Sequence, residues 1–200
     1  MKLVVATSNR GKAVELQALL APLGYEVLLP SDVGITLEVV EDAPTFLANA
    51  EKKARAYHEA TGLAALGDDS GLAVDALHGG PGVLSARYAG PGHGDRANND
   101  KLLRELDQVA DPLRTARFCC ALALITRAGT LFTAEGKCEG TLLRAPRGAS
   151  GFGYDPLFFV PALGRTLAEL STEEKNRISH RSQALQALCQ TLSAATADLV

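Results

Sequence analysis

The most constraining feature of the sequence is a pair of adjacent carboxylates, Asp68 and Asp69, placed between two apolar segments. Leu63 to Leu66 precedes the pair and Leu72 to Val74 follows it, and both segments have the composition of buried strands. A buried carboxylate without a partner is strongly unfavourable. We therefore expect a metal ion, a cation or a catalytic proton to compensate the pair. On an extended backbone the two side chains would face opposite ways.

Length and charge exclude several classes of protein. The chain has 200 residues, enough for one sizeable core, and we expect residues 1–200 to form a single domain with two lobes. The net charge of −3 argues against a general nucleic-acid or membrane surface. The cysteines and histidines show no zinc-ligand spacing. The short apolar start is neither a signal peptide nor a membrane span, so we expect a cytoplasmic protein with reduced thiols.

Apolar periodicity predicts alternating strands and helices along the chain. The first expected helix follows the turn of residues 8–12 and runs to about Leu23, and the others begin at Pro44 or Thr45, at Asp95 and near Ser179. A glycine-rich loop over residues 79–94 is too long to be incidental, since long ordered loops in compact domains are usually functional. The expected strands are Lys2 to Thr7, Tyr25 to Leu29, Ile35 to Val40, the two segments around the carboxylates, a hairpin of residues 115–127 and 130–143, and Leu157 to Val160.

Three cations are expected to point inward from helices. Lys12 heads the apolar stripe of the first helix, Lys53 lies inside the stripe of the second, and Arg181 lies inside that of the last. For each lysine the alternative is a side chain that reaches solvent. An inward Lys53 would need Asp68, Asp69 or a bound phosphate as its partner. His180 lies outside the last stripe, and a surface or capping histidine is the simpler interpretation.

Cations, carboxylates and aromatic residues on glycine-rich loops together predict a nucleoside triphosphate site. Mg²⁺ prefers one or two carboxylates plus phosphate oxygens, and loop aromatics suit a stacked base. The turn at Gly11 and Lys12 is not a Walker A loop, because Ala6 and Ala13 stand where glycine and Ser or Thr are required. The Gly151-x-Gly153 pattern lacks the third glycine of a dinucleotide-binding motif.

Short motifs in a fixed order resemble one family, the inosine triphosphate pyrophosphatases, over nearly the whole chain from Val4 to Leu192. The motifs are Thr7-Ser8-Asn9-Arg10-Gly11-Lys12, Thr45-Phe46 with Asn49-Ala50 and Lys53-Ala54-Arg55, Asp68-Asp69-Ser70-Gly71-Leu72, Pro81-Gly82 with Ser85-Ala86-Arg87-Tyr88, Gly151-Phe152-Gly153-Tyr154-Asp155-Pro156, and Lys175 with Ser179-His180-Arg181.

The resemblance implies a reaction, a cofactor and a fold. The reaction is hydrolysis of a non-standard purine nucleoside triphosphate (ITP, dITP or XTP) between its α- and β-phosphates, which yields the monophosphate and pyrophosphate. The cofactor is Mg²⁺, and the enzyme would be a homodimer that binds neither nucleic acid nor membrane. The fold is α/β, with a long twisted mixed sheet and flanking helices that form two lobes around a substrate cleft.

The resemblance also implies roles for particular residues. Asp69 would be the general base and a metal ligand, Glu41 the second metal ligand, and Asp68 a supporting neighbour. Phe152 would stack on the base. The residues expected to bind the triphosphate are Thr7, Ser8, Asn9, Arg10, Gly11, Lys12, Lys53 and Ser70. The residues expected around the base are Phe152, Gly153, Tyr154, Asp155, Lys175, His180 and Arg181.

Two other functions compete with this one. A pyrophosphatase of the related Maf type would act on pyrimidine or other modified nucleotides, but its motifs differ from Ser179-His180-Arg181 and from Gly151 to Asp155. A nucleotide-binding module without catalysis would have no need of a base such as Asp69. The intact Asp69 and Glu41 therefore favour an enzyme.

Overall fold

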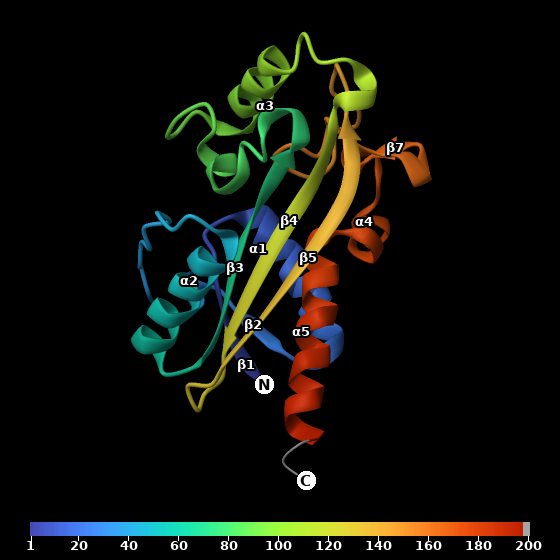
Figure 1. The fold of residues 1–200 in the computed structure, drawn as a ribbon. Helices are drawn as coiled ribbons and strands as arrows, with labels where there is room; N and C mark the ends of the chain where they lie inside the picture. The colour runs from blue at the N-terminus through green and yellow to red at the C-terminus, as the bar shows by residue number, and fades with distance from the viewer. Residues whose placement is uncertain (198–200) are drawn as a thin grey trace. The chain divides into compact units, whose positions relative to one another are not determined.

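The computed structural model describes residues 1–197, and its strands form a seven-stranded mixed sheet of order β2-β1-β3-β4-β5-β6-β7 with flanking helices (Figure 1). β1 pairs in parallel with β2 and β3, whereas β6 is antiparallel to β5 and β7. The expected α/β class with a mixed sheet is confirmed. The strands are β1 (Lys2–Ala6), β2 (Glu26–Leu28), β3 (Ala64–Val74), β4 (Thr115–Ile125), β5 (Leu131–Leu142), β6 (Phe158–Val160) and β7 (Arg165–Thr166).

The helices begin at polar caps that the sequence supplies. The side chains of Asn9, Thr45 and Ser171 each accept a backbone N–H of the first turn that follows. Within residues 1–197, no helix is long and apolar enough to cross a membrane. The α-helices are α1 (Arg10–Leu20), α2 (Phe46–Thr61), α3 (Gly94–Glu105), α4 (Thr172–Ile178) and α5 (His180–Ala197).

The chain divides into two compact units. Unit 1 consists of Met1–Asp69, Cys120–Gly136 and His180–Val200, and unit 2 consists of Ser70–Cys119 and Lys137–Ser179. Each unit has a hydrophobic core of its own.

Strand alternation builds the core of unit 1. Leu3 and Val5 pack with Leu16 of α1 and Leu185 of α5 on one face of the sheet. The intervening residues face the other way and pack beside α2, which contributes Ala50. In β3 the same period of two sends Leu66 to the α1 and α5 face and Ala65 to the α2 face. The two carboxylates that follow must therefore divide between these faces.

Gly67 allows α2 to approach β3 closely. A Cβ on Gly67 would overlap the carbonyl oxygen of Ala50, and it would lie 3.0 Å from the backbone nitrogen of Ala54. No other residue fits at this position without moving α2. The glycine thus sets how near the side chains of α2 come to Asp69.

The core of unit 2 gathers around β4 and β6. The rings of Phe118 and Phe158 lie 4.8 Å apart between centroids, at an interplanar angle of 49°. Tyr154 is buried in the same cluster, and its hydroxyl donates to the carbonyl of Ser85 at 2.9 Å. The glycine-rich loop that carries Tyr154 is thereby attached to a packed core.

Three expectations about local structure are wrong. Residues Ile35 to Val40 form no strand; Ile35 and Val39 pack instead against the core cluster of Tyr57, whose hydroxyl donates to the Leu37 carbonyl at 3.0 Å. Pro44 precedes the cap at Thr45 and lies outside α2. The two apolar segments around the carboxylates belong to one continuous strand, β3.

Candidate functional site

Asp68 and Asp69 face opposite sides of the sheet, as the strand geometry predicts. Asp68 contacts Lys12 of α1 and Arg181 of α5, whereas Asp69 contacts Lys53 of α2. All of these residues belong to unit 1. One pair of neighbouring carboxylates therefore serves two separate clusters of charge.

The Asp69 cluster joins two carboxylates through one lysine. The Lys53 ammonium lies 3.1 Å from Oδ1 of Asp69 and 3.2 Å from Oε1 of Glu41. The other carboxylate oxygen of Asp69 accepts a hydrogen bond from the Asn49 amide at 3.1 Å. Lys53 is only 6% exposed, which settles its orientation as inward. Of the two neighbouring carboxylates, Asp69 is the one that Lys53 contacts.

The two carboxylates on Lys53 differ in their pKa. Burial raises the pKa of Asp69, and the neighbouring Glu41 carboxylate adds to that effect against the opposing charge of Lys53. Burial alone would raise the pKa of Glu41, but the charges of Lys53 and Lys12 and the hydrogen bonding with Asp69 and Lys53 together hold it below its ordinary value. Asp69 is therefore the carboxylate of the pair that holds a proton more readily.

The Asp68 cluster is a buried network of opposite charges. Lys12 lies 2.8 Å from Oδ1 of Asp68, and Nε of Arg181 donates to Oδ2 at 2.6 Å. Nη1 of Arg181 donates to Glu15 on α1. Burial would raise the pKa of Asp68, but Arg181 and Lys12 together hold it well below its usual range. Asp68 is thus a fixed anion, which supports a structural or positioning role.

The turn between β1 and α1 is preformed for an anion. The Thr7 hydroxyl accepts the backbone N–H of Asn9 at 3.1 Å, and the Asn9 side chain accepts that of Lys12 at 3.1 Å. The side chains of Ser8, Asn9 and Arg10 are exposed. Because the first turn of α1 presents backbone N–H groups and a positive dipole end, this turn suits a phosphate.

A second set of predicted residues meets in unit 2. Asp155 accepts hydrogen bonds from the backbone N–H of Phe152, at 2.9 Å, and from the Lys175 ammonium. The same ammonium lies 4.8 Å from the centroid of the Phe152 ring. Tyr154 is turned into the core, as described above. The structure thus brings Phe152, Asp155 and Lys175 into mutual contact.

Two carboxylates in unit 1 fit a magnesium ion that shares its ligands with a substrate. Glu41 and Asp69 converge on one point, since both contact Lys53. Within the described residues, no group of three or more potential ligands converges on a metal site. Mg²⁺ is commonly held by one or two carboxylates, substrate phosphates and water. The donor set therefore suits Mg²⁺ with a bound phosphate better than a site made of protein ligands alone.

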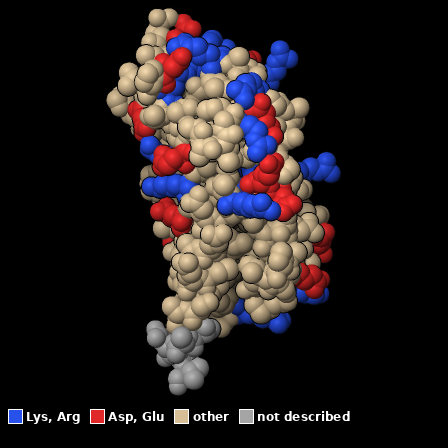
Figure 2. Space-filling view, turned by 90° about the vertical axis from the view of Figure 1, so that its right-hand side faces the viewer, with Lys and Arg blue, Asp and Glu red and all other residues tan. Residues whose placement is uncertain are grey.

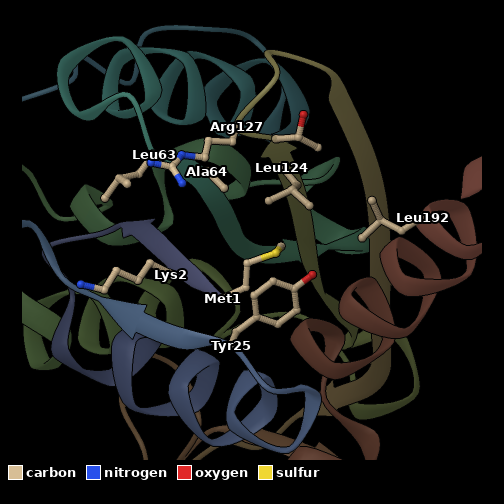
Figure 3. A pocket seen from close by; sticks show the side chains of 9 residues that line it. Met1, Lys2, Tyr25, Leu63, Ala64, Leu124, Arg127 and Leu192 are labelled. Atoms are coloured by element: carbon tan, nitrogen blue, oxygen red, sulfur yellow. The ribbon is translucent and has the colours of Figure 1, made fainter.

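A cavity of about 370 Å³ in unit 1 lies away from these clusters. Lys2 and Ala64, at the starts of the parallel strands β1 and β3, line it together with apolar side chains (Figure 3). Asp68 and Asp69 follow the opposite, carboxyl end of the same β1 and β3 pairing. The cavity therefore takes no part in the clusters of charge.

Two residues that contact these clusters were not predicted from the sequence, and the burial of a third was predicted wrongly. Asn49 lies one turn before Lys53 on α2. The spacing of four residues places the two side chains on the same face of the helix, and this spacing could have identified Asn49. Glu15 lies three residues after Lys12, but its partner Arg181 is 166 positions away along the chain. His180 is only 4% exposed, so the surface interpretation is wrong.

Comparison with known proteins shows that nearly the whole chain is similar to members of one protein family. A model of the Ham1 family matches residues 3–191. A dITP/XTP pyrophosphatase of Desulforamulus reducens is 53% identical over 193 residues, which cover 96% of each chain. A protein of the same name from Geobacter sulfurreducens is 52% identical and covers 94% of each. The solved structure of a HAM1 protein from Coxiella burnetii is 41% identical, with a TM-score of 0.85 over 97% of this chain and 99% of that one.

Proposed function

Because this chain belongs to the Ham1 family, we propose that it hydrolyses ITP, dITP and XTP to the nucleoside monophosphate and pyrophosphate. Such a reaction would remove non-standard purine nucleotides from the cytoplasmic pool. The observation that carries the proposal is the cluster at Asp69, where two carboxylates and a lysine meet at a buried point of β3. A module that only binds nucleotides has no need of this arrangement.

In the proposed reaction Asp69 accepts a proton from the attacking water. The water oxygen forms a bond to the α-phosphorus, the bond from that phosphorus to the bridging oxygen breaks, and pyrophosphate leaves. An ionised carboxylate at this position can accept the proton as a general base. Asn49 fixes the carboxylate by its hydrogen bond to Oδ2. Asp69 and Glu41 would hold the metal ion.

The triphosphate would lie on the cations of unit 1. The turn from Thr7 to Lys12 lies at the positive end of the α1 dipole, and Lys53 supplies a positive charge beside Asp69. Ser70 follows Asp69 directly on β3 and is proposed to contact the same phosphates. Charge in the transition state spreads over the phosphoryl oxygens, so positioned cations are the main catalytic device. A bound Mg²⁺ would neutralise further phosphate charge.

The base would stack on Phe152 and be selected at its edge. Hypoxanthine offers its O6 oxygen as an acceptor where adenine offers an amino donor. A protein donor directed at this position forms a hydrogen bond to O6 of hypoxanthine. With adenine bound, the same donor would face the amino group, which is also a donor. The residues that we propose for this edge in unit 2 are Asp155 and Lys175, which contact each other beside Phe152.

Removal of divalent cations tests the proposed cofactor. Dialysis against EDTA is expected to abolish pyrophosphate release from ITP, and added Mg²⁺ is expected to restore it. The reason is that Glu41 and Asp69 make an incomplete set of ligands that a divalent ion must share with the phosphates. Full activity in EDTA would contradict the assignment of both carboxylates.

Replacing Lys53 tests the phosphate assignment. We expect Lys53→Met to raise KM for ITP by about ten- to a hundredfold, the cost of losing a charged hydrogen bond. Lys52→Met is the matched control, because Lys52 is exposed and its ion pair is with exposed Asp42. Its KM should stay close to that of the unmodified protein. An unchanged KM in Lys53→Met would remove Lys53 from the phosphate site.

We also propose a homodimer. Helix α5 carries no charged residue from Ser182 to Ala197. In the lower part of the face in Figure 2, the charged side chains lie mainly along the right-hand and lower edges. Loss of charged residues at the centre is typical of protein interfaces. Light scattering would test this assembly, and a mass of 21.0 kDa, that of one chain, would contradict it.

A further inference from the structure

The loop that carries Phe152 is attached to helix α3 through its next residue. The backbone N–H of Gly153 donates to Oδ2 of Asp95 at 2.6 Å. The carbonyl of Gly153 accepts a hydrogen bond from Nδ2 of Asn99 at 2.9 Å. Asp95 and Asn99 are four residues apart and therefore share one face of α3. Both polar groups of a single peptide residue are thus held by one helix.

The backbone on either side of Phe152 leaves little freedom. Gly151 and Gly153 both have left-handed conformations, with φ of +78° and +61°. A Cβ on Gly151 would overlap the carboxylate of Asp155, which is the group that accepts the N–H of Phe152. The ring is therefore set from two directions, by Asp155 on its own N–H and by α3 on Gly153.

The hydrogen bond from Asn99 to Gly153 leaves another polar atom of Asn99 unpaired within the described residues. With Nδ2 directed at Gly153, the other amide atom of Asn99, Oδ1, is buried and has no hydrogen-bond partner among residues 1–197. Buried polar atoms are nearly always paired, and an exception calls for an explanation. Holding Gly153 in place supplies one.

We propose that Asp95 and Asn99 are positioning residues that preorganise Phe152 for the purine base. The inference rests on the proposed function, in which Phe152 stacks on the base. A ring that is already in place spares the ligand the entropic cost of ordering the loop. Neither side chain acts on a phosphate in this account. Their loss should therefore weaken ligands that carry a base and leave base-free ligands unaffected.

Kinetics on single variants separate this role from a general loss of structure. Asp95→Ala and Asn99→Ala are each expected to raise KM for ITP about three- to tenfold, while kcat stays within about twofold. Asp95→Asn keeps an acceptor for Gly153 and should restore most of the affinity. Asp100→Asn is the control, because Asp100 is exposed on the same helix and its substitution removes one negative charge, as Asp95→Ala does. The inhibition constant of pyrophosphate, which lacks a base, should not change.

An unchanged KM in both alanine variants would overturn the inference. A parallel rise in the inhibition constant of pyrophosphate would also overturn it, since that result means general disruption.

Hydrogen exchange tests the attachment without any reference to turnover. The amide of Gly153 is expected to exchange faster in Asp95→Ala and Asn99→Ala than in the unmodified protein, with Asp100→Asn unchanged. If the protein released no pyrophosphate but Gly153 lost protection in these variants, the proposed function would fail and the attachment would stand. Equal protection in all variants would refute the attachment itself.

Discussion

Asp69→Asn is expected to lower kcat for pyrophosphate release from ITP by about 10²- to 10⁴-fold, the usual contribution of a general base. The amide keeps the shape of the carboxylate but cannot accept the proton of water. The contacts that hold the phosphates do not depend on that proton. Calorimetry should therefore still detect ITP binding to the variant, and steady-state assays supply kcat.

Asp42→Asn is the matched control for this experiment. Asp42 lies in the same unit, and its carboxylate is exposed and paired with exposed Lys52. Removing the same charge there should leave kcat nearly unchanged. If Asp69→Asn retained full turnover, the base would have to be sought elsewhere. If it neither turned over nor bound ITP, Asp69 would be required for ITP binding, and its assignment as the general base would be contradicted.

Arg181→Met should lower the free energy of unfolding by about 3–5 kcal/mol, because it removes a buried cation that two buried carboxylates share. Arg181 is 1% exposed and donates to both Asp68 and Glu15. Lys12 remains on Asp68, but Asp68 and Glu15 each lose one buried ion pair. Urea unfolding at neutral pH, followed by circular dichroism, measures the change.

Arg177→Met provides the control for Arg181→Met. Arg177 forms an exposed ion pair with Glu173, and such pairs contribute about 0–1 kcal/mol. A double variant with Asp68→Asn should lose less than the sum of the two single variants, because both charges of one pair are then removed. Equal, small losses in Arg181→Met and Arg177→Met would show that the buried network does not stabilise the fold.

Local pattern was sufficient to predict much of the fold and the division of the carboxylate pair. The period of two in a strand places Asp68 and Asp69 on opposite faces, and the structure confirms it through their separate lysine partners. The inward direction of Lys12 and Lys53 also follows from helical spacing. These features depend only on the period of a single strand or helix, so they can be predicted from the local sequence.

Features that depend on distant residues could not be predicted. Ile35 to Val40 has the composition of a strand, but the segment packs against Tyr57 of α2, about 20 residues further along the chain. The pairing of Glu15 with Arg181 joins two helices from opposite ends of the chain. The attachment of Gly153 to α3 joins residues 54 and 58 positions apart. No local periodicity encodes such contacts, because they arise only when the elements pack.

The most direct test of the central claim is pyrophosphate release, measured in parallel with Mg²⁺ from ITP, XTP, dITP, ATP, GTP and UTP. We predict that kcat/KM for ITP and XTP exceeds that for ATP by at least about tenfold, since one mispaired buried polar group costs about 1–3 kcal/mol. The other product should be the nucleoside monophosphate. Equal values for ITP and ATP, or direct release of orthophosphate in place of pyrophosphate, would contradict the account.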